Sequence, residues 1–244
     1  WPLTRDARAD RFVPQVELAR IRVAQRETPL FTYKGGPATD DWTVASAALG
    51  KGGARWLPVR HPALYTGEVF ATLAAAHGLA LPAATLTDTL PAEATELARH
   101  SSDPLEGILR DMLKHSTNLT AEVAGLTASQ AASHRASAVA MREWARARHG
   151  IAPLIADHSG LGAASRLTAA DMVKLLVDVQ AGPLPSLLKD HGMQDDKGKR
   201  LKGHPVEVRA KTGTLNFVSA LAGYITPPGG RRMAFAIFAA DADR

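Results

Sequence analysis

The chain contains no cysteine among its 244 residues. This absence excludes disulfide bonds, zinc sites built on thiolates and a thiol nucleophile. Aromatic residues make up only 5% of the chain, and no apolar stretch approaches the roughly 20 residues that cross a bilayer. With 45% hydrophobic and 22% charged residues, the composition is that of a globular protein with a substantial core.

Basic residues outnumber acidic ones by 29 to 24, which gives a formal net charge of +5. These charges are scattered, and the densest cluster is Lys197, Lys199, Arg200 and Lys202. The cluster is typical of a solvated loop or of attraction to a polyanionic surface. Since no nucleic-acid-binding motif accompanies it, we expect no nucleic-acid partner.

The first sixty residues predict short strands between turns. Strand-like runs cover Val16–Val23, Leu30–Tyr33 and Arg55–Val59, and Lys34–Pro37 is typical of a turn. This pattern indicates a β-rich segment at residues 1–60.

Helical periodicity begins after Pro62. Helices are predicted over Leu64–Leu79, over Leu105–Leu113 with apolar residues at helical spacing, and over Leu119–Arg148 with a break at Gly125. A further helix is expected between Thr168 and Gly182, with the Thr168 side chain capping its N-terminus.

The last forty residues change to a period of two. Val206–Lys211 alternates apolar and charged residues, whereas Phe217–Ile225 and Met233–Ala240 are nearly continuous apolar runs joined by a turn at Pro227–Gly230. Three consecutive antiparallel strands preceded by helices predict an α+β fold, in which helices cover the sheet.

Lys211-Thr212-Gly213-Thr214 closes the alternating strand. A lysine there presents a cation at the strand, and Gly213 leaves room for a ligand that lies along the backbone. Such an edge can pair with an extended peptide while the cation meets its carboxylate. The alternative is an ordinary strand end with a turn glycine.

Ser116-Thr117-Asn118 lies between two predicted helices. In such a turn, a serine and an asparagine two residues apart can face one cleft, where the serine relays a proton and the asparagine holds an amide. The alternative is helix capping, which both residue types favour.

The two triplets occur together, in the order and on the elements of the Ser-x-Asn and Lys-Thr-Gly motifs of penicillin-binding proteins. The chain resembles the C-terminal part of a class C low-molecular-mass penicillin-binding protein, the D-alanyl-D-alanine carboxypeptidase/endopeptidase family. The resemblance covers about residues 55–240, and the further stretches that carry it are His61–Tyr65, Ser102–Leu105, Met112–Leu119 with Ala121-Glu122, Asp157–Leu161 and Arg209–Thr214.

Two residues depart from the family pattern: Leu113 stands where the family usually has Asn, and His158 stands for Gly. No Ser-x-x-Lys motif, which carries the family's nucleophile, precedes Ser116. The one match, Ser186–Lys189, follows the Ser-x-Asn triplet, and we interpret it as chance. Because the chain also opens at Trp1, we expect it to be part of a longer polypeptide, with the nucleophile upstream of residue 1.

The resemblance implies a serine DD-peptidase that cleaves D-Ala-D-Ala bonds of peptidoglycan peptides through an acyl-enzyme, and it leaves open whether D-Ala crosslinks are cleaved as well. Ser116 would carry the proton onward to the leaving amine. Lys211 would lie close to Ser116, keep the site cationic and lower the pKa of the neighbouring base. The Thr214 N–H would form half of the oxyanion hole. Asn118 would bind the substrate amide, Thr212 and Thr214 its carboxylate, and Gly213 would lie beside it. No cofactor and no metal are implied, because the family's chemistry uses side chains alone.

The fold implied is an antiparallel sheet covered by helices, similar to penicillin-binding proteins and serine β-lactamases. Residues 1–60 would be the remnant of an inserted accessory β-rich domain, and residues 61–244 an incomplete catalytic domain. The implied partners are peptidoglycan stem peptides and β-lactams, and the implied location is the periplasm. Oligomeric state and peripheral membrane association stay open. The alternatives are an inactive peptidoglycan- or partner-binding module and a serine β-lactamase or esterase.

Overall fold

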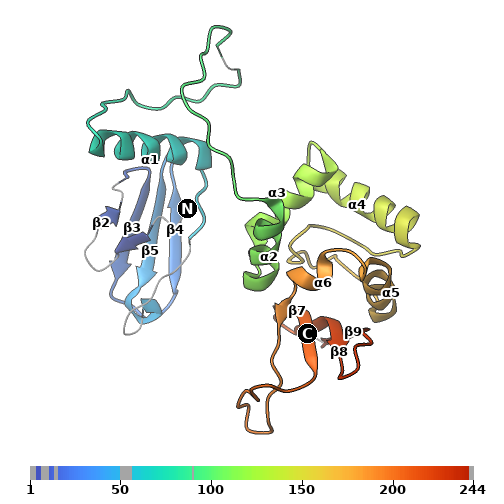
Figure 1. Ribbon diagram of the computed structural model, residues 1–244. Coiled ribbons are helices and arrows are strands. Elements are labelled where there is room, and N and C mark those ends of the chain that lie inside the picture. Colours follow the sequence, from blue (N-terminus) through green and yellow to red (C-terminus); the bar gives the residue numbers. More distant parts are fainter. Residues whose placement is uncertain (1–3, 7–10, 14–15, 50–56, 90, 242–244) are drawn as a thin grey trace. The chain divides into compact units, whose positions relative to one another are not determined.

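The computed structural model describes residues 4–6, 11–13, 16–49, 57–89 and 91–241. The chain forms two compact units, Trp1–Ala98 and Arg99–Arg244 (Figure 1). Each unit is considered by itself below. The strand predicted over Arg55–Val59 lies partly outside the described residues, and Leu57–Val59 are not in a strand.

The first unit is built on a three-stranded sheet in the order β3–β5–β4. Strands β3 (Ala19–Ala24) and β5 (Asp40–Ala45) are parallel, and β4 (Phe31–Gly35) is antiparallel to β5. The strands predicted near β3 and β4 are confirmed, whereas β5 was not predicted. A separate hairpin pairs β1 (Thr4–Asp6) with β2 (Arg11–Val13), and a 3₁₀ turn, η1 (Ser46–Leu49), follows β5.

Helix α1 (Pro62–Ala76) also belongs to the first unit. It begins at a proline, which suits the first helical turn because the missing N–H has no partner there. Its Glu68 carboxylate accepts the backbone N–H groups of Glu17 and Leu18, at 2.5 and 3.0 Å. Glu17 and Leu18 therefore hydrogen-bond to helix α1, and strand β3 begins at Ala19, later than the predicted Val16. The predicted domain boundary at residues 60/61 stays a prediction.

The second unit contains five helices among its described residues: α2 (Leu105–His115), α3 (Asn118–Ser129), α4 (His134–His149), α5 (Ala169–Val179) and α6 (Leu184–Leu187). The predicted break at Gly125 is wrong, because Gly125 lies inside α3. The chain turns instead at Gln130, which adopts a left-handed conformation (φ 53°). Ser133 then caps α4 by accepting the Ala136 N–H at 3.2 Å.

The predicted cap of α5 is confirmed. The Thr168 hydroxyl accepts the N–H of Asp171 at 3.0 Å, and Asp171 places a carboxylate in the first turn, where the helix dipole favours negative charge. The helix ends at Val179, before the predicted stop at Gly182.

An antiparallel sheet in the order β6–β7–β8–β9 completes the second unit. Its strands are β6 (Lys189–Asp190), β7 (Glu207–Leu215), β8 (Val218–Thr226) and β9 (Met233–Ala240). The three long strands are confirmed, and the two-residue β6 was not predicted. The turn between β8 and β9 closes with a hydrogen bond from the Gly230 N–H to the Pro227 carbonyl, at 3.1 Å.

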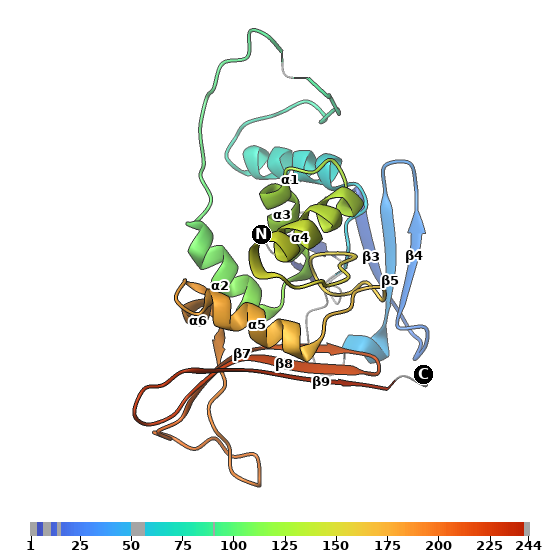
Figure 2. The same cartoon turned by 90° about the vertical axis from the view of Figure 1, so that its right-hand side faces the viewer.

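One face of this sheet packs against the helices (Figure 2). The core centres on Leu176 of α5, Leu188 and Tyr224 of β8, with Leu113 of α2 and Leu184 of α6 packed around them. The buried Tyr224 hydroxyl donates to the Leu176 carbonyl at 2.7 Å, so the packing also fixes α5 along the sheet. The predicted α+β class, with helices covering a sheet, is confirmed.

The other face of the sheet carries apolar side chains that the described residues cover incompletely. On β9, Ile237 is 61% and Met233 is 48% exposed.

Among the described residues, no helix has both the length and the apolarity to span a bilayer.

Candidate active site

Ser116 ends helix α2 in a left-handed conformation, with φ 56° and ψ 49°. Its backbone N–H donates to the Met112 carbonyl, and the chain then turns into α3 with Thr117 at the N-cap and Asn118 as the first helical residue. Thr117 makes no side-chain cap hydrogen bond. The triplet therefore joins two helices through its backbone, and the capping alternative does not account for the side chains of Ser116 and Asn118.

The Ser116 hydroxyl meets Lys211, which lies 95 residues later on β7. Lys211 Nζ donates to Ser116 Oγ at 2.9 Å and to the Thr212 carbonyl at 2.6 Å. Lys211 is opposite Ala222 in the β7–β8 register, and Ala222 belongs to the face that packs against the helices. Side chains alternate along a strand, so the register directs Lys211 toward the end of α2.

The Lys211 ammonium is partly desolvated. Burial lowers its pKa from the usual lysine value, and the nearby positive charge of Lys189 lowers it further. Both causes disfavour the protonated form. Lys189 lies on β6, opposite Ala210. No part for Lys189 in the site was predicted from the sequence, because only the β6–β7 pairing brings the two cations together.

Thr212 and Thr214 alternate with Lys211 and point to the other face of β7. Both are exposed, and neither side chain, nor that of Asn118, has a hydrogen-bond partner among the described residues. The structure thus joins Ser116 to Lys211 directly but leaves the three other polar side chains unpaired. They are free to bind a ligand.

The outer edge of β7 is unpaired over the motif. On that side β6 pairs only with Arg209 and Ala210, so within the described residues no strand lies beside Lys211–Leu215. A side-chain carbon at the position of Gly213 would lie 3.5 Å from Ala220 on the neighbouring strand, an ordinary contact. The edge can therefore accept an extended chain, although the Thr212 carbonyl on it already accepts from Lys211 Nζ.

The two departures from the family pattern have different environments. Leu113 packs against the core and so serves the fold. His158, in the segment Asp157–Leu161, contacts α3 and α4, and its backbone N–H donates to Glu122 at 3.3 Å. No role for Glu122 was predicted from the sequence, although the resemblance included it.

Ser186 and Lys189 do not share a helical turn. Ser186 lies in the short helix α6, Leu188 is already extended, and Lys189 lies on β6. The Ser186 hydroxyl donates to the Pro183 carbonyl at 2.8 Å. This geometry differs from a serine and a lysine one helical turn apart, which a Ser-x-x-Lys pair requires.

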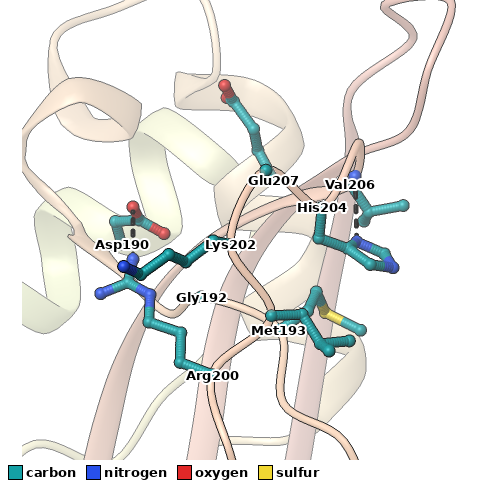
Figure 3. A pocket seen from close by; sticks show the side chains of 10 residues that line it. Asp190, Gly192, Met193, Arg200, Lys202, His204, Val206 and Glu207 are labelled. Atoms are coloured by element: carbon teal, nitrogen blue, oxygen red, sulfur yellow. Dashed lines mark hydrogen bonds and ion pairs between the residues drawn. The ribbon is translucent and has the colours of Figure 1, made fainter.

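A pocket of 480 Å³ lies at the beginning of β7 (Figure 3). Asp190 and Arg200, joined by an ion pair of 3.3 Å, lie on its wall together with Lys202, His204 and Glu207. Glu207 precedes Lys211 by four residues, about 13 Å along a strand. Neither Ser116 nor Lys211 is among the residues that line this pocket. No group of three potential metal ligands occurs in the described part of the chain.

The chain is similar in sequence to a known family of peptidases. The profile of the D-Ala-D-Ala carboxypeptidase 3 (S13) family matches residues 44–244. Carboxypeptidase DacB of Mycolicibacterium smegmatis is 28% identical over 97% of this chain and 58% of its own length. The D-alanyl-D-alanine carboxypeptidase of Actinomadura sp. is 32% identical over 73% of this chain and 37% of its own length.

The fold is similar to that of penicillin binding protein 4 from Haemophilus influenzae, solved in complex with a β-lactam. The TM-score is 0.66 at 21% sequence identity, over 93% of this chain and 58% of that chain. The present chain spans less than two thirds of these relatives. The family match covers most of it, including both motifs, and the chain belongs to the D-Ala-D-Ala carboxypeptidase 3 family.

Proposed function

We propose that this chain carries part of the active site of a serine DD-peptidase, which hydrolyses D-Ala-D-Ala bonds of peptidoglycan peptides through an acyl-enzyme. The observation that supports this most directly is the 2.9 Å hydrogen bond between Lys211 Nζ and Ser116 Oγ. It joins two motifs that are far apart in sequence, and it gives a hydroxyl a cationic partner at an open strand edge.

In the proposed reaction, a serine outside these 244 residues attacks the carbonyl carbon of the scissile amide, while the neutral lysine of its Ser-x-x-Lys motif takes the hydroxyl proton. The C–N bond breaks and leaves an ester on the serine, and the D-Ala amine departs with that proton, which reaches it through the Ser116 hydroxyl. Water then cleaves the ester and restores the serine hydroxyl. Lys211 holds that hydroxyl and keeps the site cationic, which lowers the pKa of a neighbouring base. The whole protein would work in the periplasm.

The substrate would lie along the free edge of β7. The unpaired hydroxyls of Thr212 and Thr214 would bind its terminal carboxylate, and Asn118 would hydrogen-bond an amide of the acyl part. The Thr214 N–H would donate to the oxyanion that forms during attack. One donor of this kind lowers the barrier by about 3–4 kcal/mol.

The testing experiment is the intact mass of the full-length, gene-encoded protein before and after incubation with a penicillin. The proposal expects a gain of one penicillin mass, with the adducted peptide outside residues 1–244. An adduct on Ser186 would overturn the assignment of the nucleophile. The absence of any adduct would instead support a binding module without catalysis.

A β-lactamase or esterase would differ in how long the adduct persists. In a DD-peptidase the penicilloyl ester is hydrolysed slowly, so the mass shift survives removal of free penicillin. If the shift disappears within seconds while penicillin is consumed catalytically, the peptidase assignment fails in favour of a β-lactamase.

A further inference from the structure

The segment Asp157–Gly162 forms a tight loop after α4. The Asp157 carboxylate accepts the N–H of Gly160 at 2.9 Å through Oδ1 and that of Gly162 through Oδ2. These bonds fix the internal shape of the loop. Contacts made by two neighbouring residues, His158 and Ser159, determine where the loop is attached.

The first attachment is to Glu122 of α3. Its carboxylate accepts the backbone N–H of Ser159 at 2.9 Å and that of His158 at 3.3 Å. Burial raises the pKa of Glu122, but hydrogen bonds from Ser159 and His158 outweigh this and leave the pKa lowered. Glu122 lies four residues after Asn118, one helical turn or about 6 Å along α3. The loop is therefore attached within one turn of a proposed substrate-binding residue.

The second attachment is the His158 ring itself. Its Nε2 lies 2.8 Å from the hydroxyl of Ser137, a fully buried residue of α4, and Ser137 in turn donates to the Gly125 carbonyl at 3.3 Å. The ring occupies the space beside Gly125, where any side-chain carbon would overlap the imidazole. Gly125 thus gives α3 a notch into which the ring fits, and the ring connects the loop to both helices.

We propose that His158 is a positioning residue, which locks the 157–162 loop to α3 and α4 and so fixes Asn118 and the loop as one rigid wall of the substrate site. The inference rests on the proposed function. It concerns a residue at which this chain departs from the family pattern. His158 acts through α3 and the loop, because its ring is directed into the Gly125 notch and bonds to Ser137.

The test is a double-mutant cycle of Gly125→Ala and His158→Gly in the full-length protein. Gly125→Ala alone forces the ring out and is expected to lower the second-order rate constant of penicillin acylation about tenfold, since small misplacements are costly. His158→Gly alone is expected to lower it less. In the double mutant, Gly125→Ala should cost no more than about twofold beyond His158→Gly, because the two changes share one contact.

A second measurement is independent of catalysis: hydrogen exchange of the amides of residues 158–162. Exchange should accelerate in Gly125→Ala and in His158→Gly, and Gly125→Ala should add nothing when His158 is already absent. The matched control is Gly107→Ala, the same change in helix α2, where a side-chain carbon meets no atom within 4 Å. This control should leave acylation and exchange unchanged.

The outcomes separate this inference from the proposed function. If the unmodified protein is not acylated, the proposed function fails, and the exchange data still test the lock. If the effects of the two substitutions simply add, or if Gly125→Ala leaves loop exchange as it was, the lock does not exist. If Gly125→Ala lowers protection uniformly across the unit, its effect is not confined to the loop. The His158→Gly variant, which removes the ring without steric overlap, then decides whether the lock exists.

Discussion

Lys189 and Lys211 lie on neighbouring strands, and the charge on the first helps to lower the pKa of the second. Of these two cations, Lys211 donates to the Ser116 hydroxyl, whereas Lys189 acts on Lys211 through its charge. The pairing gives the site a pH dependence that can be tested directly.

Replacing Lys189 by methionine should raise the pKa of Lys211, because one of the two causes that lower it is removed. If the Lys211 ammonium is required, acylation declines as pH rises through its pKa, so the alkaline limb should move to higher pH in Lys189→Met. The measurement is the pH profile of the penicillin acylation rate. Lys197→Met serves as the control, since Lys197 is not among the charges that shift Lys211, and an equal displacement there would contradict the assignment.

The same pKa has a consequence for stability. Lys211 in the folded protein loses its proton below the usual value of 10.5. Between the lowered pKa of folded Lys211 and 10.5, the unfolded chain binds more protons than the folded one. The free energy of unfolding should therefore increase as pH rises toward 10.5. In Lys211→Met this contribution should vanish. Urea unfolding at several alkaline pH values measures it, and an unchanged slope in the variant would count against the desolvated lysine.

Removal of the Ser116 hydroxyl should abolish most activity. We expect Ser116→Ala to lower acylation by a factor of about 10²–10⁴, the range of a positioned proton-transfer group. Ser186→Ala is the matched control, because within the described part of the chain its hydroxyl bonds to the Pro183 carbonyl alone. The acylation rates of Ser116→Ala and Ser186→Ala test which serine transfers the proton. Loss of activity in Ser186→Ala, with Ser116→Ala active, would reverse the assignment of the two serines.

Lys211→Ala should affect acylation far more than stability. The side chain is held by a hydroxyl and a carbonyl, and its charge is disfavoured by burial. Its removal should therefore change the free energy of unfolding by no more than about 1 kcal/mol, while the acylation rate falls at least about 100-fold. Parallel losses in both measurements would indicate a structural role only.

Two strand glycines offer a matched pair. A side chain at Gly223 would overlap the Arg209 carbonyl and Ala210 on β7, whereas one at Gly213 makes an ordinary contact with Ala220. Gly223→Ala should therefore destabilise the protein by about 2–3 kcal/mol through overpacking. Gly213→Ala should fold normally but hinder a ligand at the β7 edge, which appears as weaker substrate binding. Thermal melts and acylation kinetics distinguish these effects, and the reverse order would contradict the roles assigned to the two glycines.

Local signals in the sequence predicted much of the second unit. Thr168 and Asp171 specify a helix start by their own hydrogen bond, and the apolar runs of β8 and β9 are long enough to exclude a surface loop. The pairing of the Ser-x-Asn and Lys-Thr-Gly triplets followed from the resemblance, and the bond between Ser116 and Lys211 is consistent with it.

Features that depend on contacts distant in sequence could not be predicted. Gly125 is a poor helix former when judged alone, so a break was expected there, but the missing side chain makes room for the His158 ring. Strand β5 carries Asp40 at its start, and this buried carboxylate is tolerated because Tyr33 and the Arg60 N–H bond to it. The influence of Lys189 on Lys211 likewise arises only after β6 pairs with β7.

Because the backbone of Ser116 is left-handed, stability and activity favour different residues at position 116. A residue with a side chain is destabilised by about 1–2 kcal/mol in that conformation, and glycine is not. A laboratory library selected only for survival of heating would therefore enrich glycine at position 116, and it would discard the hydroxyl that meets Lys211. A search for stabilised variants of this protein must therefore screen activity as well as stability, because the most stabilising single replacement at this turn also inactivates the site.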